Sequence, residues 1–399
     1  MTSAGSTEGV IYLDHNATTP VAAEVADAME PYLREHFANP SSDHVLGRRA
    51  WRAVEEARGQ VAVLIGAAAD EIVFTSGGTE SNNLAIFGVA AAAAPTRRRI
   101  VTSNVEHPAT TSPCGRLEAD GWAVARVPVT AAGTLDPNAF AGQLSTDVAL
   151  ATVMLAQNET GALMPIAAIA ALARGVGAVV HTDAAQAIGK IPVAVDTLGV
   201  DLCSIAGHKC YGPKGVGALY VRRGTPLRPM LVGAGQEHGL RPGTENVAGI
   251  VGLGAACALA QARLAADRAR LRGLRDALWA TLSGEIDGLV CHTPLDASLP
   301  NTLYVSFPGV LGADVLAHAP GVAASTGSAC HSGEHRPSST LLAMGVAPES
   351  ALGAVRLSLG RDTTTEDIAA AAGMLAAAYR HAAAGRGPHD GPGEGSTSQ

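Results

Sequence analysis

The chain has 399 residues, which is enough for two or three domain-sized units and for a large core without disulfides or a structural metal. Hydrophobic residues make up 47% of it and charged residues 16%, and the mean hydropathy of +0.18 excludes a disordered chain. The net charge of −8 argues against nucleic-acid binding, because phosphate backbones are bound by basic surfaces.

Targeting and membrane signals are not expected. Met1–Val10 has neither a basic residue nor an apolar core, so it does not resemble a secretory signal. The longest apolar run, Val247–Ala260, has 14 residues and is too short for a bilayer, so it is predicted to be a buried helix. We therefore expect a soluble, cytoplasmic protein that binds no membrane.

The cysteines do not form a metal-binding or disulfide pattern. None of the six lies in a Cys-x-x-Cys pair, which disfavours zinc and all-cysteine cluster sites. We expect no metal site and no disulfide framework, and we expect most of these thiols to be small buried groups. The six are Cys114, Cys203, Cys210, Cys257, Cys291 and Cys330.

Short apolar runs alternate with helical stretches along the first part of the chain. Glu71–Thr75 is predicted to be a strand that leads through Ser76–Glu80 into a helix over Ser81–Ala94. Apolar strands that alternate with helices predict an α/β fold with a mostly parallel sheet covered on both faces. The later predicted strands are Arg99–Thr102, Val148–Leu155, Gly177–His181, Asp201–Ile205 and Gly217–Val221.

A second, smaller α/β unit is predicted after a long helix around Ala255–Leu282. Its strands are expected at Asn301–Ser306 and Ala354–Ser358, with a loop rich in Gly, Ser and His at 323–339 between them. The tail Ala384–Gln399 is rich in Gly, Pro and Ser and is predicted to be disordered.

Polar residues gather where the predicted strands of the first unit end. Thr79, His107, Asn158, Asp183 and Lys209 each follow one of these runs closely. In open α/β sheets, ligands bind at the carboxyl ends of the strands. The pattern therefore predicts a single site built from these five side chains.

Lys209 and Asp183 point to the chemistry of that site. A partly desolvated lysine can lose its proton and form an imine with a carbonyl cofactor, whereas the alternative is a surface lysine in a loop. A buried carboxylate needs a cationic partner, and a protonated pyridine nitrogen supplies one; the alternative is a helix cap. Together the two residues indicate pyridoxal phosphate.

A phosphate site is predicted at the turn Ser76–Glu80. Glycine allows close approach of the backbone, and the helix that follows offers free N–H groups to an anion. Thr79 adds a hydroxyl there, and Ser204 and His208 are expected to supply further contacts. A tight turn without a ligand is the alternative.

Three further residues are candidates on their own surroundings. His107 is expected to stack on a flat cofactor and move protons, or to be a hydrogen-bonded structural histidine. Cys330 lies among small residues with two histidines after it, which suits a reactive thiol. Arg356 lies in an apolar strand and is expected to bind a substrate carboxylate or to form an internal salt bridge.

Taken together, the motifs resemble those of the cysteine desulfurases, in the class V aminotransferase group of fold-type I pyridoxal phosphate enzymes. The resemblance covers about Ile11 to Ala378. The motifs that carry it are Tyr12–Pro20, Asn39–Ser42, Phe74–Asn83, Glu106–His107, Asn158–Gly161, His181–Gln186, Gly207–Lys209, Tyr211–Gly217, Arg241–Asn246, Gly327–Cys330 and Arg356–Arg361.

The resemblance implies a two-domain architecture and a homodimer. The large cofactor-binding domain would cover residues 18–264, with a mostly parallel seven-stranded sheet. The small α/β domain would cover residues 1–17 and 265–383 and carry the loop with Cys330. Thr244 would reach the cofactor phosphate of the partner subunit.

The resemblance also implies individual roles. Lys209 would bind the cofactor and move the proton on Cα, while Cys330 would attack the substrate sulfur, leaving alanine and a Cys330 persulfide for an acceptor protein. The expected cofactor ligands are Gly78, Thr79, His107, Asp183 (pyridinium nitrogen), Gln186 (phenolic oxygen), Ser204, His208 and Thr244, and the expected substrate-carboxylate ligands are Asn158 and Arg356.

Some details depart from the housekeeping pattern and leave alternatives open. His331 and Ser332 after Cys330, and the stretch from Gly235 to Thr244, resemble animal selenocysteine lyases, so a selenocysteine lyase acting on L-selenocysteine is the main alternative. An aminotransferase or another carbon–sulfur lyase would not need Cys330. A non-catalytic sulfur-relay scaffold would need clustered cysteines. The acceptor could be an iron–sulfur scaffold, a tRNA-thiolation protein or a sulfur carrier.

Overall fold

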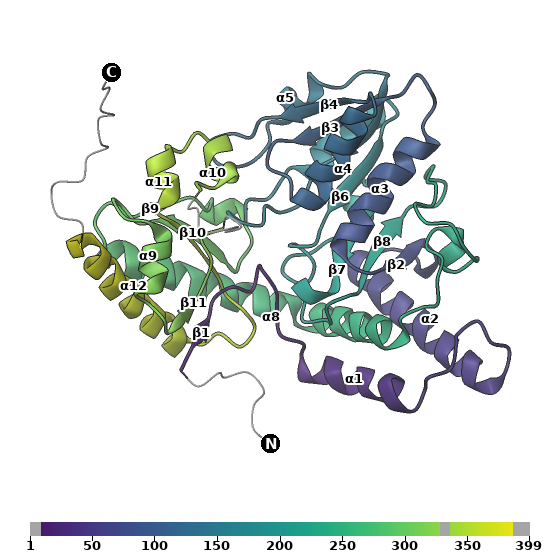
Figure 1. Cartoon of the computed structure of the whole chain (residues 1–399), viewed down its shortest axis with the longest axis horizontal. Helices are drawn as coiled ribbons and strands as arrows, with labels where there is room; N and C mark the ends of the chain where they lie inside the picture. Colours follow the sequence, from purple (N-terminus) through teal and green to yellow (C-terminus); the bar gives the residue numbers. More distant parts are fainter. Residues whose placement is uncertain (1–8, 328–335, 386–399) are drawn as a thin grey trace, which may run out of the picture.

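A computed structural model describes residues 9–327 and 336–385. Its centre is a seven-stranded sheet in the order β2-β8-β7-β6-β5-β3-β4 (Figure 1). Neighbouring strands are parallel except where β8 pairs with β2 and β7, so the predicted mostly parallel sheet is confirmed. The strands are β2 Ile72–Thr75, β3 Arg99–Ser103, β4 Ala123–Val127, β5 Val148–Thr152, β6 Val179–Asp183, β7 Leu202–Ala206 and β8 Gly217–Val221.

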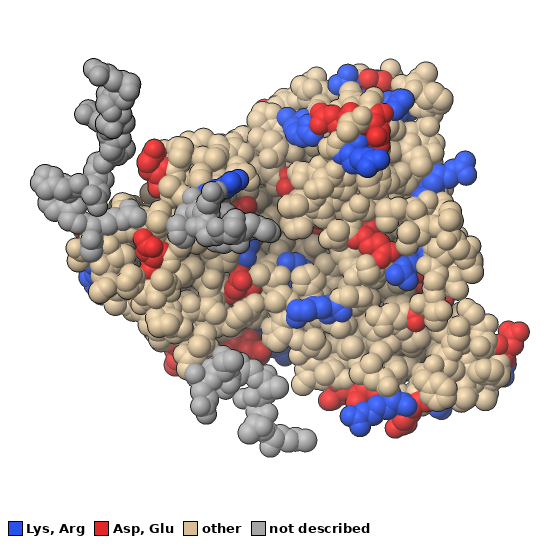
Figure 2. All heavy atoms as spheres, in the orientation of Figure 1, with Lys and Arg blue, Asp and Glu red and all other residues tan. Residues whose placement is uncertain are grey.

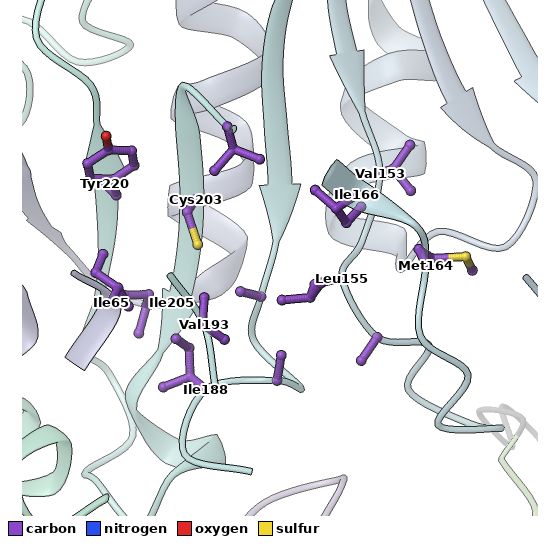
Figure 3. Packing of buried hydrophobic residues seen from close by; sticks show 14 of the residues in the cluster. Ile65, Val153, Leu155, Met164, Ile166, Ile188, Val193, Cys203, Ile205 and Tyr220 are labelled. Carbon is purple, nitrogen blue, oxygen red and sulfur yellow. The ribbon is translucent and has the colours of Figure 1, made fainter. Parts of the chain in front are cut away.

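Helices cover both faces of this sheet, as the apolar strands require. Successive strand residues face opposite sides: Ile72 and Phe74 pack in a cluster with α2 and α8, whereas Val73 packs in a second cluster with α3 and α4. Figure 3 shows the larger cluster around Ile65, Cys203 and Tyr220. The helices are α1 Ala23–Arg34, α2 Val45–Ile65, α3 Gly78–Ala92, α4 Pro108–Ala119, α5 Pro137–Ala141, α6 Ile166–Gly175, α7 Val195–Leu198 and α8 Val247–Glu285.

A smaller unit follows, built on the antiparallel sheet β12-β10-β9 and the parallel pair β1-β11. Its core is a separate apolar cluster that includes Leu13 from the start of the chain and Leu375 from the last helix. The elements are β1 Ile11–Tyr12, β9 Val290–Cys291, β10 Thr302–Ser306, α9 Gly312–Ala317, β11 Val322–Ala323, α10 Ser339–Ala343, α11 Pro348–Leu352, β12 Ala354–Ser358 and α12 Thr365–Gly385.

One helix joins the two units. The predicted helices over Val247–Ala260 and Ala255–Leu282 are a single helix, α8. Its buried apolar side chains from Ile250 to Ala260 belong to the large cluster, and its buried leucines from Leu271 to Leu282 belong to the small one. The predicted domain boundary at residues 264/265 therefore falls inside a continuous helix, at the point where α8 passes from one core to the other.

α8 is also long and apolar enough, by length and composition alone, to cross a membrane. Half of its most apolar segment is buried inside the protein, where α8 packs against α1 and α2.

The surface carries charges of both signs. On the face shown in Figure 2, basic and acidic side chains are interspersed instead of forming a broad basic surface.

Two sequence expectations about loops need adjustment. The predicted loop 323–339 begins at the end of β11 and ends at the start of α10, and residues 328–335 lie outside the described part. The tail was predicted to be disordered from Ala384, but α12 continues through Gly385 because the alanine-rich sequence before it favours helix. Residues 386–399 lie outside the described part.

Candidate active site

Polar side chains from the ends of several strands line one pocket of about 190 Å³. All five residues predicted to meet there line this pocket: four follow strands, as the strand-end argument requires, and Thr79 lies at the start of α3. The lining residues are Gly78, Thr79, Asn82, His107, Ala109, Met154, Ala156, Asn158, Asp183, Ala185, Gln186, Ala206, His208 and Lys209.

Asp183, the last residue of β6, presents a buried carboxylate to the pocket. Its Oδ1 accepts from the Ala185 N–H at 2.9 Å, and its Oδ2 accepts from Asn82 Nδ2 at 2.6 Å. Both donors are neutral, so they orient the carboxylate without neutralising its charge. The helix-cap alternative accounts for one of the oxygens only.

Lys209 lies just beyond β7, with its amine at the pocket wall. Its Nζ donates to the main-chain oxygens of Asn16 at 2.6 Å and Ala17 at 2.8 Å. Burial lowers the pKa of this amine to about 8, and the Arg356 cation adds to the effect. A much larger share of this amine is therefore neutral and nucleophilic at physiological pH than of an exposed lysine.

This lowered pKa gives a testable expectation for cofactor capture. About a quarter of the Lys209 amine is neutral at pH 7.5 if its pKa is about 8, against about a thousandth at the ordinary 10.5. We expect the rate at which the apoprotein binds pyridoxal phosphate, followed by stopped-flow absorption, to rise with pH around a midpoint near 8. A rate still rising tenfold per unit at pH 9.5 would contradict this.

The N-terminus of α3 forms one wall of the pocket. Its N-cap, Gly77, has φ +149°, which side-chain-bearing residues rarely adopt, and no side chain caps the helix. The first-turn N–H groups beside Thr79 are thus available to an anion. His208 lies near the same wall, with its Nδ1 3.1 Å from Thr18 Oγ1, and burial lowers the pKa of this imidazole to about 4.

Ser204 does not reach this anion site, so its predicted role is corrected. It lies in the middle of β7 and is fully buried, and its Oγ is 2.9 Å from Nε2 of His181. Ala206, two residues further along the strand and therefore on the same face, lines the pocket instead. The error came from treating the whole strand end as exposed to the ligand.

His107 caps α4 and lines the pocket. Its Nδ1 accepts from the Ala109 N–H at 3.0 Å, which leaves the proton of the neutral ring on Nε2. Desolvation by the surrounding protein lowers the pKa of His107; the Asp183 carboxylate opposes this effect and the Lys209 charge adds to it. Beneath it, the buried carboxyl of Glu106 accepts from the Met154 N–H at 3.0 Å and fixes this segment against the end of β5.

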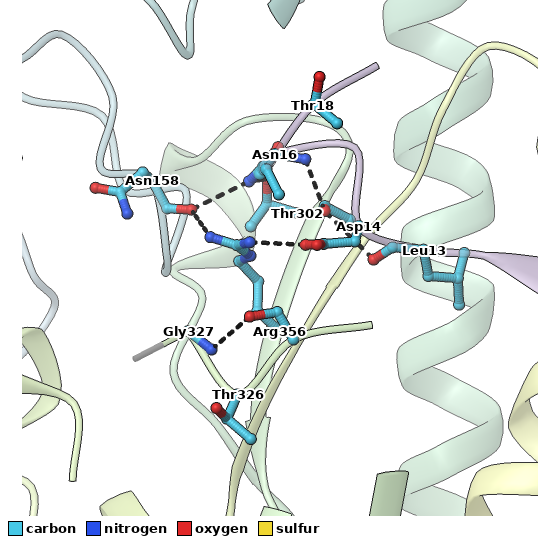
Figure 4. A network of polar contacts seen from close by, with 12 residues as sticks. Leu13, Asp14, Asn16, Thr18, Asn158, Thr302, Thr326, Gly327 and Arg356 are labelled. Atoms are coloured by element: carbon cyan, nitrogen blue, oxygen red, sulfur yellow. Dashed lines mark hydrogen bonds and ion pairs between the residues drawn. The ribbon is translucent and has the colours of Figure 1, made fainter. Parts of the chain in front are cut away.

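Arg356 forms the internal salt bridge that was one of its two predicted possibilities (Figure 4). Its Nη2 lies 2.7 Å from Asp14 Oδ1, and its Nη1 donates to the main-chain oxygen of Asn158 at 3.1 Å. The internal salt bridge is therefore present. Its Nε is buried and has no hydrogen-bond partner among the described residues. The Asn158 side chain lines the pocket, whereas Arg356 is outside the lining.

Sequence reasoning gave no role to Asn16, which connects several site residues. Its main-chain oxygen also accepts from Gln186 Nε2 at 2.8 Å, and its Oδ1 accepts from Lys190 Nζ at 2.8 Å. Its Nδ2 donates to Thr302 Oγ1 at 2.9 Å (Figure 4). Asn16 lies in the Tyr12–Pro20 motif, so the motif located it, but only the fold shows what it touches.

Glu159 is a second residue without a predicted role. Its buried carboxylate accepts from Ser338 Oγ at 2.5 Å and from Thr340 Oγ1 at 2.7 Å. The Tyr304 hydroxyl lies 3.2 Å from the same carboxylate and 3.0 Å from the oxygen of Thr326. Glu159 therefore binds the segment after residues 328–335 directly and the segment before them through Tyr304. Glu159 directly follows Asn158.

Besides Ser204 and Arg356, two further predicted site residues are not placed in the pocket. Cys330 lies outside the described residues. Thr244 is exposed and is not among the pocket-lining residues, and the structure holds a single chain. Of the other cysteines, Cys114, Cys203, Cys210 and Cys257 are buried as expected, and Cys291 is half-buried. Within residues 9–327 and 336–385, no group of three or more His, Cys, Asp or Glu side chains is placed to hold a metal ion.

Comparison with known proteins decides the family. The family model for class-V aminotransferases matches residues 11–370. The cysteine desulfurase IscS of Dictyoglomus turgidum is 47% identical over 360 residues, which cover 90% of this chain and 91% of that protein. The chain belongs to the cysteine desulfurase family.

Other relatives agree. The cysteine desulfurase NifS of Azotobacter vinelandii is 44% identical over 361 residues, 90% of each chain. A solved NifS-like protein superimposes with a TM-score of 0.88 at 36% identity, over 93% of this chain and 100% of that one. A structure described as SspA in complex with cysteine has a TM-score of 0.78 at 34% identity, over 87% and 98%.

This cysteine desulfurase is therefore an enzyme that depends on pyridoxal phosphate. Curated relatives at 44–47% identity are cysteine desulfurases, so the selenocysteine-lyase alternative is not favoured. The pocket fits the cofactor on its own geometry. It offers an amine of low pKa, a buried carboxylate with only neutral partners, and an uncapped helix N-terminus.

Proposed function

We propose that this pocket is the active site of the desulfurase, with roles assigned to individual residues. Lys209 holds the aldehyde carbon of the cofactor, Asp183 pairs with its ring nitrogen, and Gln186 donates to its ring oxygen. The phosphate binds at the start of α3, with Gly78, Thr79 and His208. The observation that carries the proposal is the presence of the Lys209 amine and the Asp183 carboxylate in one pocket beside an uncapped helix N-terminus.

The residues then act on bound L-cysteine. Arg356 and Asn158 hold the substrate carboxylate; the support is that Asn158 lines the pocket and that the Arg356 guanidinium contacts the main-chain oxygen of Asn158. Pyridoxal phosphate, when bound, supplies the electron sink that lets the carbon–sulfur bond break. The neutral Lys209 amine takes the proton from Cα, and His107, with its proton on Nε2, exchanges protons on the other side of the pocket.

Cys330 receives the sulfur. Its thiolate attacks the substrate sulfur, so that a sulfur–sulfur bond forms as the carbon–sulfur bond breaks. The carbon takes up a proton and leaves as L-alanine, and the persulfide on Cys330 passes its outer sulfur to an acceptor protein. This acceptor is an iron–sulfur scaffold or a sulfur carrier, and the enzyme acts in the cytoplasm as a homodimer in which Thr244 contacts the phosphate of the partner subunit.

The domain division supports this arrangement. We place the large cofactor-binding domain at residues 18–264 and the small domain at 1–17 and 265–383. The division of α8 between two apolar clusters and the inclusion of Leu13 in the smaller one support these bounds.

The test is alanine release from L-cysteine by the purified, cofactor-loaded protein. Cys330→Ala is expected to bind L-cysteine with a change in visible absorption and to release no alanine, because the sulfur acceptor is missing. Cys291→Ala, which changes a half-buried thiol in the small unit, is the matched control and should keep the rate. Normal alanine release by Cys330→Ala would overturn the role of this residue.

A further inference from the structure

The chain contains only three lysines, Lys190, Lys209 and Lys214, among its 28 basic residues. The other 25 are arginines, so arginine is the usual basic residue of this protein. A lysine therefore indicates a position at which an arginine side chain would not fit or would not function. A guanidinium is larger than an ammonium group and stays charged, whereas an amine can be neutral when buried. Lys209 has a role in the proposed function, and Lys190 has none.

Lys190 is buried next to the pocket, with 8% of its surface exposed. Its Nζ donates to Gln186 Oε1 and to Asn16 Oδ1, both at 2.8 Å, and both acceptors are uncharged amide oxygens. The groups that act on its charge are the cations Lys209 and Arg356 and, with a smaller and opposite influence, the thiol of Cys210. Burial, reinforced by the two cations, holds the pKa of Lys190 well below its ordinary value. An arginine here would bury a permanent charge among cations.

The contacts of Lys190 fix which way round the Gln186 amide lies. Oε1 of Gln186 faces the Lys190 amine, and its Nε2 donates to the main-chain oxygen of Asn16 at 2.8 Å. Exchanging the amide oxygen and nitrogen would set acceptor against acceptor at the Asn16 main-chain oxygen and would remove the oxygen that accepts from Lys190 Nζ. The amide therefore has one N–H left over, and Gln186 lines the cofactor pocket.

We propose that Lys190 is a positioning residue that holds the Gln186 amide so that its free N–H, and not its oxygen, faces the ring oxygen of the cofactor. This rests on the proposed function of the pocket. The same Asn16 oxygen also accepts from Lys209 Nζ. One main-chain oxygen therefore positions both the lysine that binds the cofactor and the glutamine that donates to the cofactor. Lys190 itself touches neither substrate nor cofactor.

The experiment is a pH titration of the visible absorption of the cofactor-loaded protein. An N–H that donates to the ring oxygen stabilises the negative charge of that oxygen. This stabilisation matters most at high pH, when the proton shared between the ring oxygen and the Lys209 nitrogen has been lost. Without that donor the proton is held more tightly. Lys190→Met removes the donors at similar length, and we expect the midpoint of the titration to rise by about one pH unit.

A double-mutant cycle separates positioning from a general structural effect. Gln186→Leu removes the donor directly, so Lys190→Met added to it should produce no further rise. Lys190→Gln, which keeps an amide donor, should shift the midpoint less than Lys190→Met. An unchanged midpoint in Lys190→Met, or additive shifts in the cycle, would overturn the proposal. If Lys190→Met does not fold, the same cycle is run with Lys190→Gln, and additive shifts have the same meaning.

The outcomes also distinguish this proposal from the one it rests on. Wild-type protein that shows no visible band with pyridoxal phosphate would overturn the assignment of the pocket. A normal band whose midpoint is insensitive to Lys190 would overturn the positioning role alone. Arg223→Met, which removes a cation from an exposed surface pair with Asp70, is the matched control and should leave the midpoint unchanged.

Discussion

Replacing Lys209 by alanine is expected to abolish both the visible absorption of the bound cofactor and the release of alanine. The variant loses the amine that forms the bond to the aldehyde and the base that moves the Cα proton. Loss of proton transfer alone costs about 10²–10⁴-fold in rate. Loss of the covalent bond adds to this, so alanine release measured by chromatography should fall below about a thousandth of the wild-type rate.

The structure supplies a way to separate this effect from misfolding. The Lys209 amine contacts the main-chain oxygens of Asn16 and Ala17, which can bind water in its place. The variant should therefore fold, and small primary amines added to the assay should restore part of the rate. A surface replacement, Arg380→Ala, serves as the control. A Lys209→Ala protein with a normal visible band and normal turnover would contradict the assignment.

The second large effect is expected on stability, from Arg58→Met. Arg58 and Glu237 form a buried pair, with Nη1–Oε2 at 2.7 Å and Nη2–Oε1 at 2.8 Å. The guanidinium also donates to the Ile72 oxygen and lies over the ring of Phe74. Methionine leaves a buried carboxylate with the Phe74 N–H as its remaining donor. The expected loss is about 3–5 kcal/mol in the free energy of unfolding, measured in urea.

Two further variants test whether the loss of stability comes from the burial of an unpaired charge. Arg223→Met breaks an exposed pair and should leave stability unchanged, because solvent screens that interaction. The double replacement Arg58→Met with Glu237→Leu removes both charges and should recover much of the loss. Equal destabilisation by Arg58→Met and Arg223→Met would show that burial of the pair is not what matters. Glu237 and His238 both have positive φ, so the pair also holds a strained turn beside Arg241–Asn246.

The sequence predicted the buried strands of the large sheet better than its edge strand β4 and the short strands β1 and β11. Strands β2, β5 and β7 are mostly apolar runs that are buried throughout, and such runs are easily recognised. β4 was missed because it lies at the sheet edge and its residues Ala123–Val127 are mostly exposed or half-buried. The two-residue strands β1 and β11 pair across more than 300 residues, and no local pattern signals such a contact.

Those site residues that directly follow a buried strand could be predicted from the sequence. Asp183 and Lys209 follow buried strands, so their convergence followed from topology. Ser204 was misplaced because depth along a strand is not visible in a motif. Lys190 and Asn16 were missed because their importance lies in contacts between segments that are 174 residues apart. Polar contacts of that kind depend on the complete fold.

The contacts of Asn16 imply an order of events during synthesis. The large sheet has all its strands once the ribosome has passed Val221. Asn16, which contacts Lys209, is held by Thr302 through its side chain and by Ser358 through its main-chain N–H. Contacts that distant close late. The growing polypeptide therefore lacks a finished cofactor site until almost all of it has been made, and an incomplete or truncated product should not capture pyridoxal phosphate.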